Sequence, residues 1–220
     1  MARFVQAFLF VVGFILSAPL LRAGEREQRE YSVFIDGREA GSTTIDIDAQ
    51  DNGTTVVTTR ASIKVQRLIV LYSLTFDTSE CWKDGKLVSL TSQAKENGKA
   101  TNITMAAEGN QLRARINGQE RMLPGDVWTS TFWKLPDAKF HNNQLALFEI
   151  DTGKDYKGQL QFVGTEQLTI LNKLMPCFHF RYTGGATPTD VWFDSQHRLV
   201  RQEFVEMGHK TIGQLIQVKR

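Results

Sequence analysis

From Tyr31 onward, short runs of the chain alternate between apolar and polar residues. Ile103 and Met105 alternate with polar neighbours, and so do Leu112 and Ala114. A period of two is typical of a β-strand with one buried face and one wet face. The runs are separated by dipeptides that tolerate the positive φ angles of tight hairpins. These are Asp36-Gly37, Asn52-Gly53, Asp84-Gly85, Asn97-Gly98, Gly109-Asn110 and Asn117-Gly118. The pattern predicts a β-meander.

The second half of the chain repeats this pattern. Its strand-like runs cover residues 145–151, 159–163, 167–171, 177–182, 189–194, 198–205 and 210–218. In the last run Ile212, Ile216 and Val218 fall on one face of a strand, so we expect the C-terminus to lie inside the sheet.

Two segments break the alternation. Residues 65–76 are strongly apolar, and either a strand buried on both faces or a short helix would fit them; their β-branched and aromatic content favours the strand. Residues 123–144 contain Pro124, Gly125 and Pro136. Asp126 could cap one short helix there, and residues 134–144 then form a polar loop.

About twelve to fourteen short strands and no long helical pattern predict a mainly β fold. So many strands rarely stay flat, so we expect a single curved antiparallel meander sheet, as a half-barrel or two packed layers, with one short helical insert. No stretch has the composition of a linker. Residues 24–220 are therefore predicted to form a single antiparallel β domain, and its curved sheet would have a concave face.

Residues 1–23 are predicted to be a secretory signal peptide. Arg3 precedes an apolar run at residues 4–16, and Pro19 precedes a cleavage region that ends at Ala23. A membrane anchor would need about 20 apolar residues, and no later run is long enough either. We therefore expect an exported protein, periplasmic or extracellular, with no membrane span after cleavage.

The charge of the mature chain argues against nucleic acid as a partner. The full sequence has 26 basic and 24 acidic residues, and cleavage removes Arg3 and Arg22 from the basic set. A neutral chain has no long-range field to attract phosphate backbones. The partners we expect are a lipid or other apolar small molecule, or an envelope protein; the oligomeric state stays open.

The cysteines and histidines suggest no metal or cofactor. Cys81 and Cys177 would both be exported, where they could form a disulfide or remain two buried thiols. Without a C-x-x-C motif, a redox-active dithiol is not indicated. The four histidines are scattered singly, at His141, His179, His197 and His209, so zinc is not supported.

The sequence has no recognisable catalytic motif. It contains no G-x-S-x-G elbow, and Gly184-Gly185 leads to a proline and not into a helix. A non-enzyme is therefore favoured. The alternative is a cell-envelope hydrolase with a distributed site, for which Cys177, His179 and Arg181 are the first candidates because they share one strand face. The simpler interpretation of that face is the less apolar side of a core strand.

Aromatic residues give the clearest indication of binding. Trp128, Phe132 and Trp133 crowd the central connection, and together with Arg181 they are the candidate ligand-binding residues. The two indoles could line an apolar pocket at the mouth of a curled sheet. The alternative, which we favour, is a plug in which Trp128 and Phe132 seal one end of the core.

Several strand and turn segments resemble a known family. In the second half they are Thr131-Phe132-Trp133, Asp151-Thr152-Gly153, Gly164-Thr165-Glu166, Arg181-Tyr182-Thr183-Gly184, Val191-Trp192-Phe193-Asp194 and Arg198-Leu199-Val200. In the first half they are Trp82, Asp84-Gly85, Leu87-Val88-Ser89 and Asn97-Gly98. In this order they resemble the uncharacterised secreted bacterial proteins of domain-of-unknown-function family 6134. The resemblance implies a curved antiparallel sheet, loosely like that of periplasmic carriers of lipid or lipoprotein, and implies no activity.

The leading hypothesis is an exported, non-catalytic β domain whose concave face binds an apolar ligand or a partner segment. The alternatives are the hydrolase named above and a structural protein that pairs strand edges in an envelope assembly.

Overall fold

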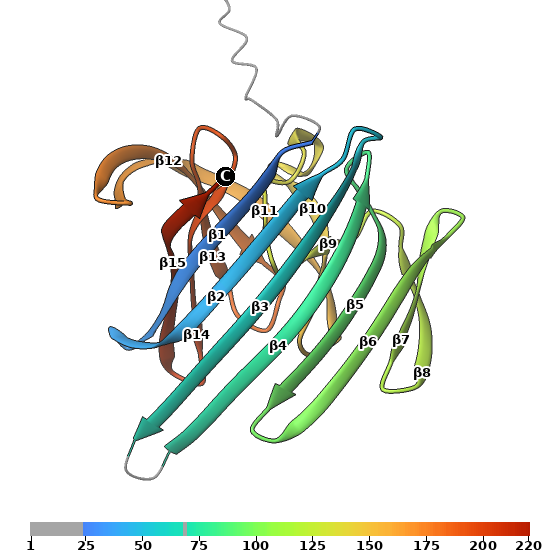
Figure 1. Cartoon of the computed structure of the whole chain (residues 1–220), viewed down its shortest axis with the longest axis horizontal. Helices are drawn as coiled ribbons and strands as arrows, with labels where there is room; N and C mark the ends of the chain where they lie inside the picture. The colour runs from blue at the N-terminus through green and yellow to red at the C-terminus, as the bar shows by residue number, and fades with distance from the viewer. Residues whose placement is uncertain (1–23, 68–69) are drawn as a thin grey trace, which may run out of the picture.

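The computed structural model describes residues 24–67 and 70–220, which form fifteen strands and one helical turn (Figure 1). The strands are β1 (Arg26–Ile35), β2 (Arg38–Ala49), β3 (Thr54–Arg67), β4 (Val70–Lys83), β5 (Lys86–Glu96), β6 (Lys99–Glu108), β7 (Gln111–Ile116), β8 (Gln119–Pro124), β9 (Trp128–Thr129), β10 (Asn143–Phe148), β11 (Asp155–Ile170), β12 (Lys173–Thr183), β13 (Thr189–Phe193), β14 (Leu199–Glu206) and β15 (His209–Lys219). The turn is the 3-10 helix η1 (Ala138–Phe140). The expected signal peptide, residues 1–23, lies outside the described residues and stays a prediction.

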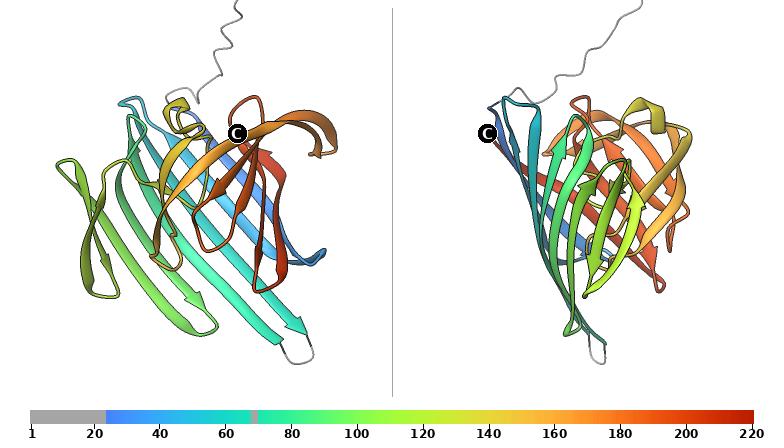
Figure 2. Two further views of the ribbon diagram at one scale, coloured as in Figure 1. Left: turned by 180° about the vertical axis from the view of Figure 1, so that it is seen from behind. Right: turned by 90° about the vertical axis from the view of Figure 1, so that its right-hand side faces the viewer.

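All the strands belong to one sheet, in which β1 pairs with β15 and sequence neighbours otherwise pair in order, from β8 at one edge to β9 at the other. The sheet curves so strongly that the strands of the first half of the chain face those of the second half (Figure 2). Among the described strands no ladder joins β8 to β9. The predicted fold class, a single curved antiparallel meander sheet in the form of a half-barrel or two packed layers, is confirmed, and the described strands do not close into a barrel.

The predicted turn dipeptides form tight hairpins. Asp36 and Gly37 have φ angles of 50° and 76°, and Asn97 and Gly98 have 48° and 86°. Two consecutive residues with positive φ make the turn type whose twist matches that of the flanking strands. Asn and Asp adopt this conformation at little cost, which explains why these dipeptides mark the hairpins so well.

Two predicted strand boundaries are wrong. Residues 65–76 are not one strand: β3 ends at Arg67, β4 begins at Val70, and residues 68–69 lie outside the described part. The strands predicted at 159–163 and 167–171 are the single strand β11. In its pairing with β12 the register shifts between Phe162 and Gly164. Such a bulge adds one residue and bends a strand without ending it, so the alternation breaks although the strand continues.

The short helix expected after Asp126 is absent from the described chain, and the helical turn η1 lies later. Trp128 and Thr129 instead pair in parallel with Leu147 and Phe148 of β10. The amide of Ser130 continues this pairing by donating to the carbonyl of Phe148 over 2.9 Å. The backbone of this segment thus forms hydrogen bonds with the edge of the sheet. A short isolated helix would instead leave the N–H and C=O groups at its ends without partners.

Side chains hold the two sheet edges near each other. Three residues separate Pro124 of β8 from Trp128 of β9, so these positions lie within about 15 Å. Arg121 of β8 donates to the carbonyl of Gly153 and pairs with Asp155 of β11, with 2.7 Å between Nη2 and Oδ1. Arg121 therefore links the edge strand β8 to the β10–β11 loop.

Replacing Arg121 with alanine is expected to loosen this link with little loss of global stability. The two charged side chains are 41% and 33% exposed, and such pairs contribute about 1 kcal/mol or less. Hydrogen exchange should show faster exchange in β8 and in residues 149–154, with unchanged exchange in β1–β4. Unchanged protection of β8 would mean that the hairpin is held by other contacts.

Candidate ligand-binding pocket

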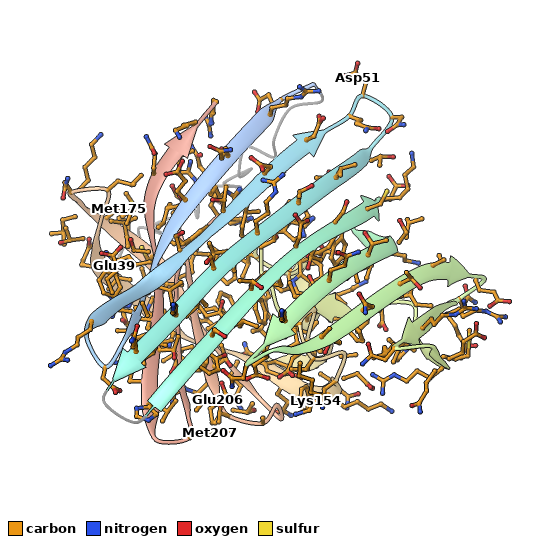
Figure 3. The ribbon with its side chains drawn as sticks, turned by 60° about the horizontal axis from the view of Figure 1, so that its bottom comes forward. Glu39, Asp51, Lys154, Met175, Glu206 and Met207 are labelled. Atoms are coloured by element: carbon orange, nitrogen blue, oxygen red, sulfur yellow. The ribbon has the colours of Figure 1, made fainter. Side chains whose placement is uncertain are left out.

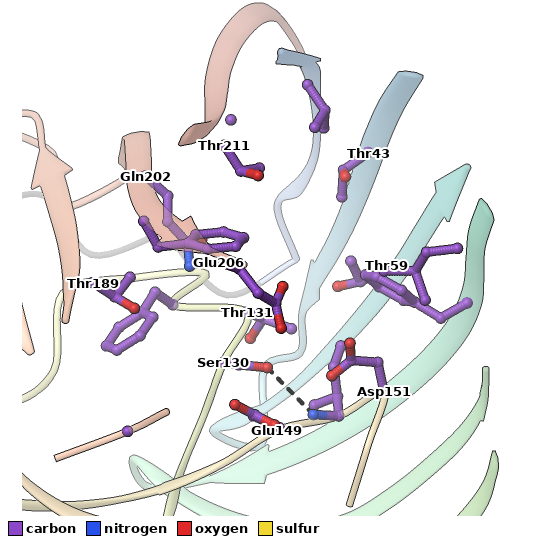
Figure 4. A pocket seen from close by; sticks show the side chains of 18 of the residues that line it. Thr43, Thr59, Ser130, Thr131, Glu149, Asp151, Thr189, Gln202, Glu206 and Thr211 are labelled. Atoms are coloured by element: carbon purple, nitrogen blue, oxygen red, sulfur yellow. Dashed lines mark hydrogen bonds between the residues drawn. The ribbon is translucent and has the colours of Figure 1, made fainter. Parts of the chain in front are cut away.

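A pocket of about 260 Å³ lies in the concave face, between the inner faces of β1–β4 on one side and β14 and β15 on the other (Figure 4). Residues 130–132, 147, 149–152, 182, 185–187 and 189 complete its lining. The pocket is open to solvent. Glu206 and Met207 at the β14–β15 hairpin and Lys154 of the β10–β11 loop are exposed, and all three lie at the same end of the molecule (Figure 3).

The walls of the pocket are mainly apolar. Inward positions of successive strands provide Tyr31, Val33, Ile45, Ile63, Leu74, Phe76, Leu147, Leu199 and Phe204. These positions alternate with outward residues along each strand, as the period-two pattern requires. Tyr31 satisfies its hydroxyl by donating to the carbonyl of Leu199 over 2.8 Å, so its ring is held against the wall.

The three aromatic candidates from the central connection have different positions. Phe132 lines the pocket. Trp128 and Trp133 are 1% and 4% exposed and pack on Trp82 of β4, with ring centroids 4.7 and 6.0 Å away. The two indoles therefore fill the core beside the pocket, while Phe132 forms part of its surface.

The mouth of the pocket carries three carboxylates. Glu149 and Asp151 come from the β10–β11 loop, and Glu206 lies at the end of β14. Their side chains extend into the same space (Figure 4). Burial and the nearby charges of Glu149 and Glu96 raise the pKa of Asp151 to about 6. Desolvation and the charges of Glu96 and Glu149 also raise the pKa of Glu206, whereas Lys154 lowers it.

A row of polar side chains lies on the inner face of β3–β5, between apolar neighbours. Thr59 lines the pocket and is 2% exposed, and its hydroxyl has no hydrogen-bond partner among the described residues. Thr78 of β4 lies opposite Thr59 in the β3–β4 pairing. The hydroxyl of Thr78 lies 2.8 Å from that of Ser92 on β5, so these two hydroxyls are paired with each other. Buried hydroxyls are normally paired, so the state of Thr59 is unusual.

Glu80 is a fully buried acid beside this row. Its Oε2 accepts hydrogen bonds from Trp82 Nε1 and Thr129 Oγ1, each 2.9 Å long, but Oε1 has no partner among the described residues. Burial raises the pKa of Glu80 to about 7, against the hydrogen bonds that favour the carboxylate. Folding therefore opposes the ionisation of Glu80.

The Glu80→Gln variant is expected to be more stable than the natural protein at about pH 8, by about 1–2 kcal/mol. Because the folded pKa exceeds the unfolded one, stabilisation by neutral Glu80 is complete below the unfolded pKa and is lost as pH rises through about 7. The amide oxygen can still accept from Trp82 and Thr129. Urea unfolding should show the difference shrinking at about pH 5; an equal difference at both pH values would contradict this assignment.

The fourth candidate, Arg181, lies outside the pocket. It is exposed on the outer face of β12 and forms two hydrogen bonds to Asp190, 2.8 and 3.0 Å long, whereas its neighbour Tyr182 lines the pocket. His179 lies between carboxylates on the same outer face, with Nδ1 2.7 Å from Glu166 and Nε2 2.7 Å from Asp190. The structure thus brings His179 and Arg181 together through Asp190, away from Phe132.

Cys177 has the properties of a structural thiol. It is fully buried, and burial together with the charges of Asp194 and Glu166 raises its pKa to about 11. A thiol in that state is a poor nucleophile near neutral pH. Cys81 and Cys177 both belong to the described chain and both are free, so the disulfide that the sequence allowed is not formed.

Two other features are absent from the described residues. No group of three or more His, Cys, Asp or Glu side chains there could hold a metal ion. None of those residues lies in a helix long and apolar enough to cross a membrane.

Sequence reasoning missed the polar residues in the pocket and in the core beside it. Thr59 and Glu80 occupy inward positions in runs that otherwise alternate normally, so a polar residue at a core position was the available signal. Asp151 belongs to the Asp151-Thr152-Gly153 segment, which was used only as a family feature. Glu206 precedes Met207 and Gly208, whose φ angles of 50° and 81° form a hairpin turn without the Asn or Asp that usually marks one.

The solved structures that align with the chain share little sequence with it. A β-barrel-like protein of another domain of unknown function, DUF1849, from Brucella abortus aligns with a TM-score of 0.64 and 10% identity, over 88% of this chain and 97% of that one. A candidate lipoprotein from Parabacteroides distasonis aligns at 0.39 and 12% identity, over 89% of this chain and 95% of that one. A candidate exported protein with a YmcC-like fold from Bacteroides fragilis aligns at 0.37 and 10% identity, over 90% and 97%. The first similarity supports the fold alone.

No curated protein matches the chain. A family model does match, over residues 31–215, which is most of the β domain and agrees with the resemblance of its strand and turn segments. The chain therefore belongs to the family described as Domain of unknown function (DUF6134).

Proposed function

We propose that the protein is an exported, non-catalytic β domain that binds an apolar or amphipathic small molecule in the pocket of its concave face. The observation that carries this proposal is the pocket itself. It remains open between β1–β4 and β14–β15 although apolar side chains surround it. Concave, mainly apolar pockets with a few polar groups are the usual form of small-molecule sites.

The size of the pocket limits the ligand. Its volume of about 260 Å³ is slightly below the range of about 300–1,000 Å³ that is common for ligand pockets. An apolar cavity of about 150 Å³ already binds benzene. One alkyl chain or a small ring system is therefore the group that we expect to enter.

Gly213 gives a direct test, because a side chain there would occupy the pocket. Gly213 lines the pocket from β15, and a Cβ added to it would meet no atom within 4 Å. The Gly213→Phe variant is expected to fold, since a glycine inside a strand weakens it and phenylalanine favours strands. Its affinity for an alkyl probe such as decyl maltoside, measured by calorimetry, should fall at least tenfold.

The matched control is Ile212→Phe, which adds bulk to the adjacent residue on the other face of β15 and should bind like the natural protein. If the natural protein and Gly213→Phe bind the probe equally, the pocket is not the binding site. If neither the natural protein nor the control binds any alkyl probe, the proposed function is wrong.

A further inference from the structure

We infer that the ligand of this pocket is a cationic amphiphile, with an apolar chain or ring inside the pocket and an ammonium or guanidinium group at its mouth. This inference rests on the proposed function and specifies its ligand class. Three features carry it: the carboxylates at the mouth, the apolar walls behind them, and one buried hydroxyl without a partner.

The carboxylates come from different parts of the chain and meet at one opening. Glu149 and Asp151 belong to the β10–β11 loop, and Glu206 ends β14. Glu149 accepts a hydrogen bond of 2.5 Å from the hydroxyl of Thr152, which fixes its position in the loop. The carboxylates of Asp151 and Glu206 extend toward the middle of the opening (Figure 4).

The charges of these carboxylates repel one another. Glu96 at the end of β5 adds a fourth carboxylate whose charge acts on both Asp151 and Glu206, while Lys154 opposes it at Glu206. A cation at the opening would replace this repulsion with attraction, which is stronger near a partly buried site than in bulk water. Because the described acids form no group suited to a metal ion, an organic cation is the better fit.

The apolar walls exclude a simple hydrophilic cation as the whole ligand. Phe76, Phe132 and Phe204 line the same pocket as the carboxylates. Filling that space with hydrocarbon removes apolar surface from water, which stabilises binding. A ligand with both an apolar part and a cationic end would use both regions.

Thr59 indicates where a second polar atom of the ligand would lie. Thr59 is 2% exposed, and its hydroxyl lacks a partner among the described residues and points into the pocket (Figure 4). A hydroxyl can donate or accept, and an unpaired buried one is unfavourable. An ester, amide or hydroxyl group along the ligand would give Thr59 its missing hydrogen bond.

The test compares decyltrimethylammonium, decyl maltoside and decyl sulfate, which share one chain and differ in head group. At low ionic strength the cationic probe should bind at least tenfold more tightly than the neutral one, and the anionic probe most weakly. High salt should reduce the difference, because exposed charges are screened. The double variant Asp151→Asn, Glu206→Gln should lose the preference while still binding the neutral probe.

That double variant keeps the shapes of both side chains and removes repulsion, so it is expected to fold. Glu120→Gln, which removes an exposed acid of β8 outside the pocket, is the control and should keep the preference. Equal binding of all three probes, stronger binding of the anion, or a preference that survives in the double variant would overturn the inference and leave the proposed function intact. Failure of every probe would instead overturn the proposed function.

Discussion

Replacing Trp128 with alanine is expected to cost about 3–5 kcal/mol of the free energy of unfolding, because it removes a fully buried indole from the centre of the core. Trp128 is 1% exposed and its ring lies 4.7 Å from that of Trp82. It also begins β9, so the cavity left by alanine would lie between the connection and the main sheet. Denaturant unfolding followed by Trp fluorescence and by circular dichroism should measure the loss.

The control is Trp128→Phe. The indole Nε1 of Trp128 has no hydrogen-bond partner among the described residues, so phenylalanine sacrifices packing but no hydrogen bond. Its cost should therefore be clearly smaller than that of alanine. A loss below about 1 kcal/mol for Trp128→Ala would show that the tryptophan cluster does not stabilise the core.

Replacing Arg29 with methionine is expected to cost about 3 kcal/mol near neutral pH, because it leaves a buried carboxylate without its main partner. Arg29 and Glu27 project inward from β1, their side chains are 2% and 1% exposed, and Nε lies 2.6 Å from Oε1. Arg29 also donates to the carbonyl of Trp133, so it connects β1 to the aromatic segment. Glu27 would keep Arg220 at 3.0 Å, which limits the loss.

The pH dependence distinguishes this charge effect from lost packing. Burial acts to raise the pKa of Glu27, but the charge and hydrogen bonds of Arg29 and the hydrogen bond from Arg220 hold it below its usual value. A lowered pKa gives stability that is present above the unfolded pKa and is lost as pH falls through the folded pKa. The deficit of Arg29→Met should therefore shrink on acidification. The double variant Glu27→Gln, Arg29→Met should recover part of it; an unchanged deficit at all pH values would indicate packing alone.

The fold could be predicted because its signals are local. Alternation along each strand and dipeptides such as Asn97-Gly98 depend on neighbouring residues, and the structure has the meander that they indicate. The errors occurred where local signals are ambiguous. A bulge between Phe162 and Gly164 interrupts the alternation without ending β11. The apolar run at residues 65–76 contains the end of β3 and the start of β4, but its sequence resembles one buried strand. The segment after Asp126 pairs with β10, which is distant in sequence. The intrinsic helix propensity of a segment cannot predict such a contact.

The pocket could be predicted only as a concave face. Phe132 belongs to its lining, but Trp128 and Trp133 were indistinguishable from it in sequence, because the three occupy one short segment. Whether each aromatic side chain belongs to the core or to the pocket depends on whether it packs on Trp82 or lines the pocket with Tyr31. The acids of the mouth, Glu149 and Glu206, meet through loop and hairpin ends that no periodic pattern aligns.

The central claim is that the pocket holds a small molecule, and native mass spectrometry of the protein purified from the organism that encodes it tests this most directly. The natural protein should carry an excess mass that disappears on denaturation, and Gly213→Phe prepared in the same way should lack it. A bare mass for the natural protein, or the same bound mass on Gly213→Phe, would contradict the claim.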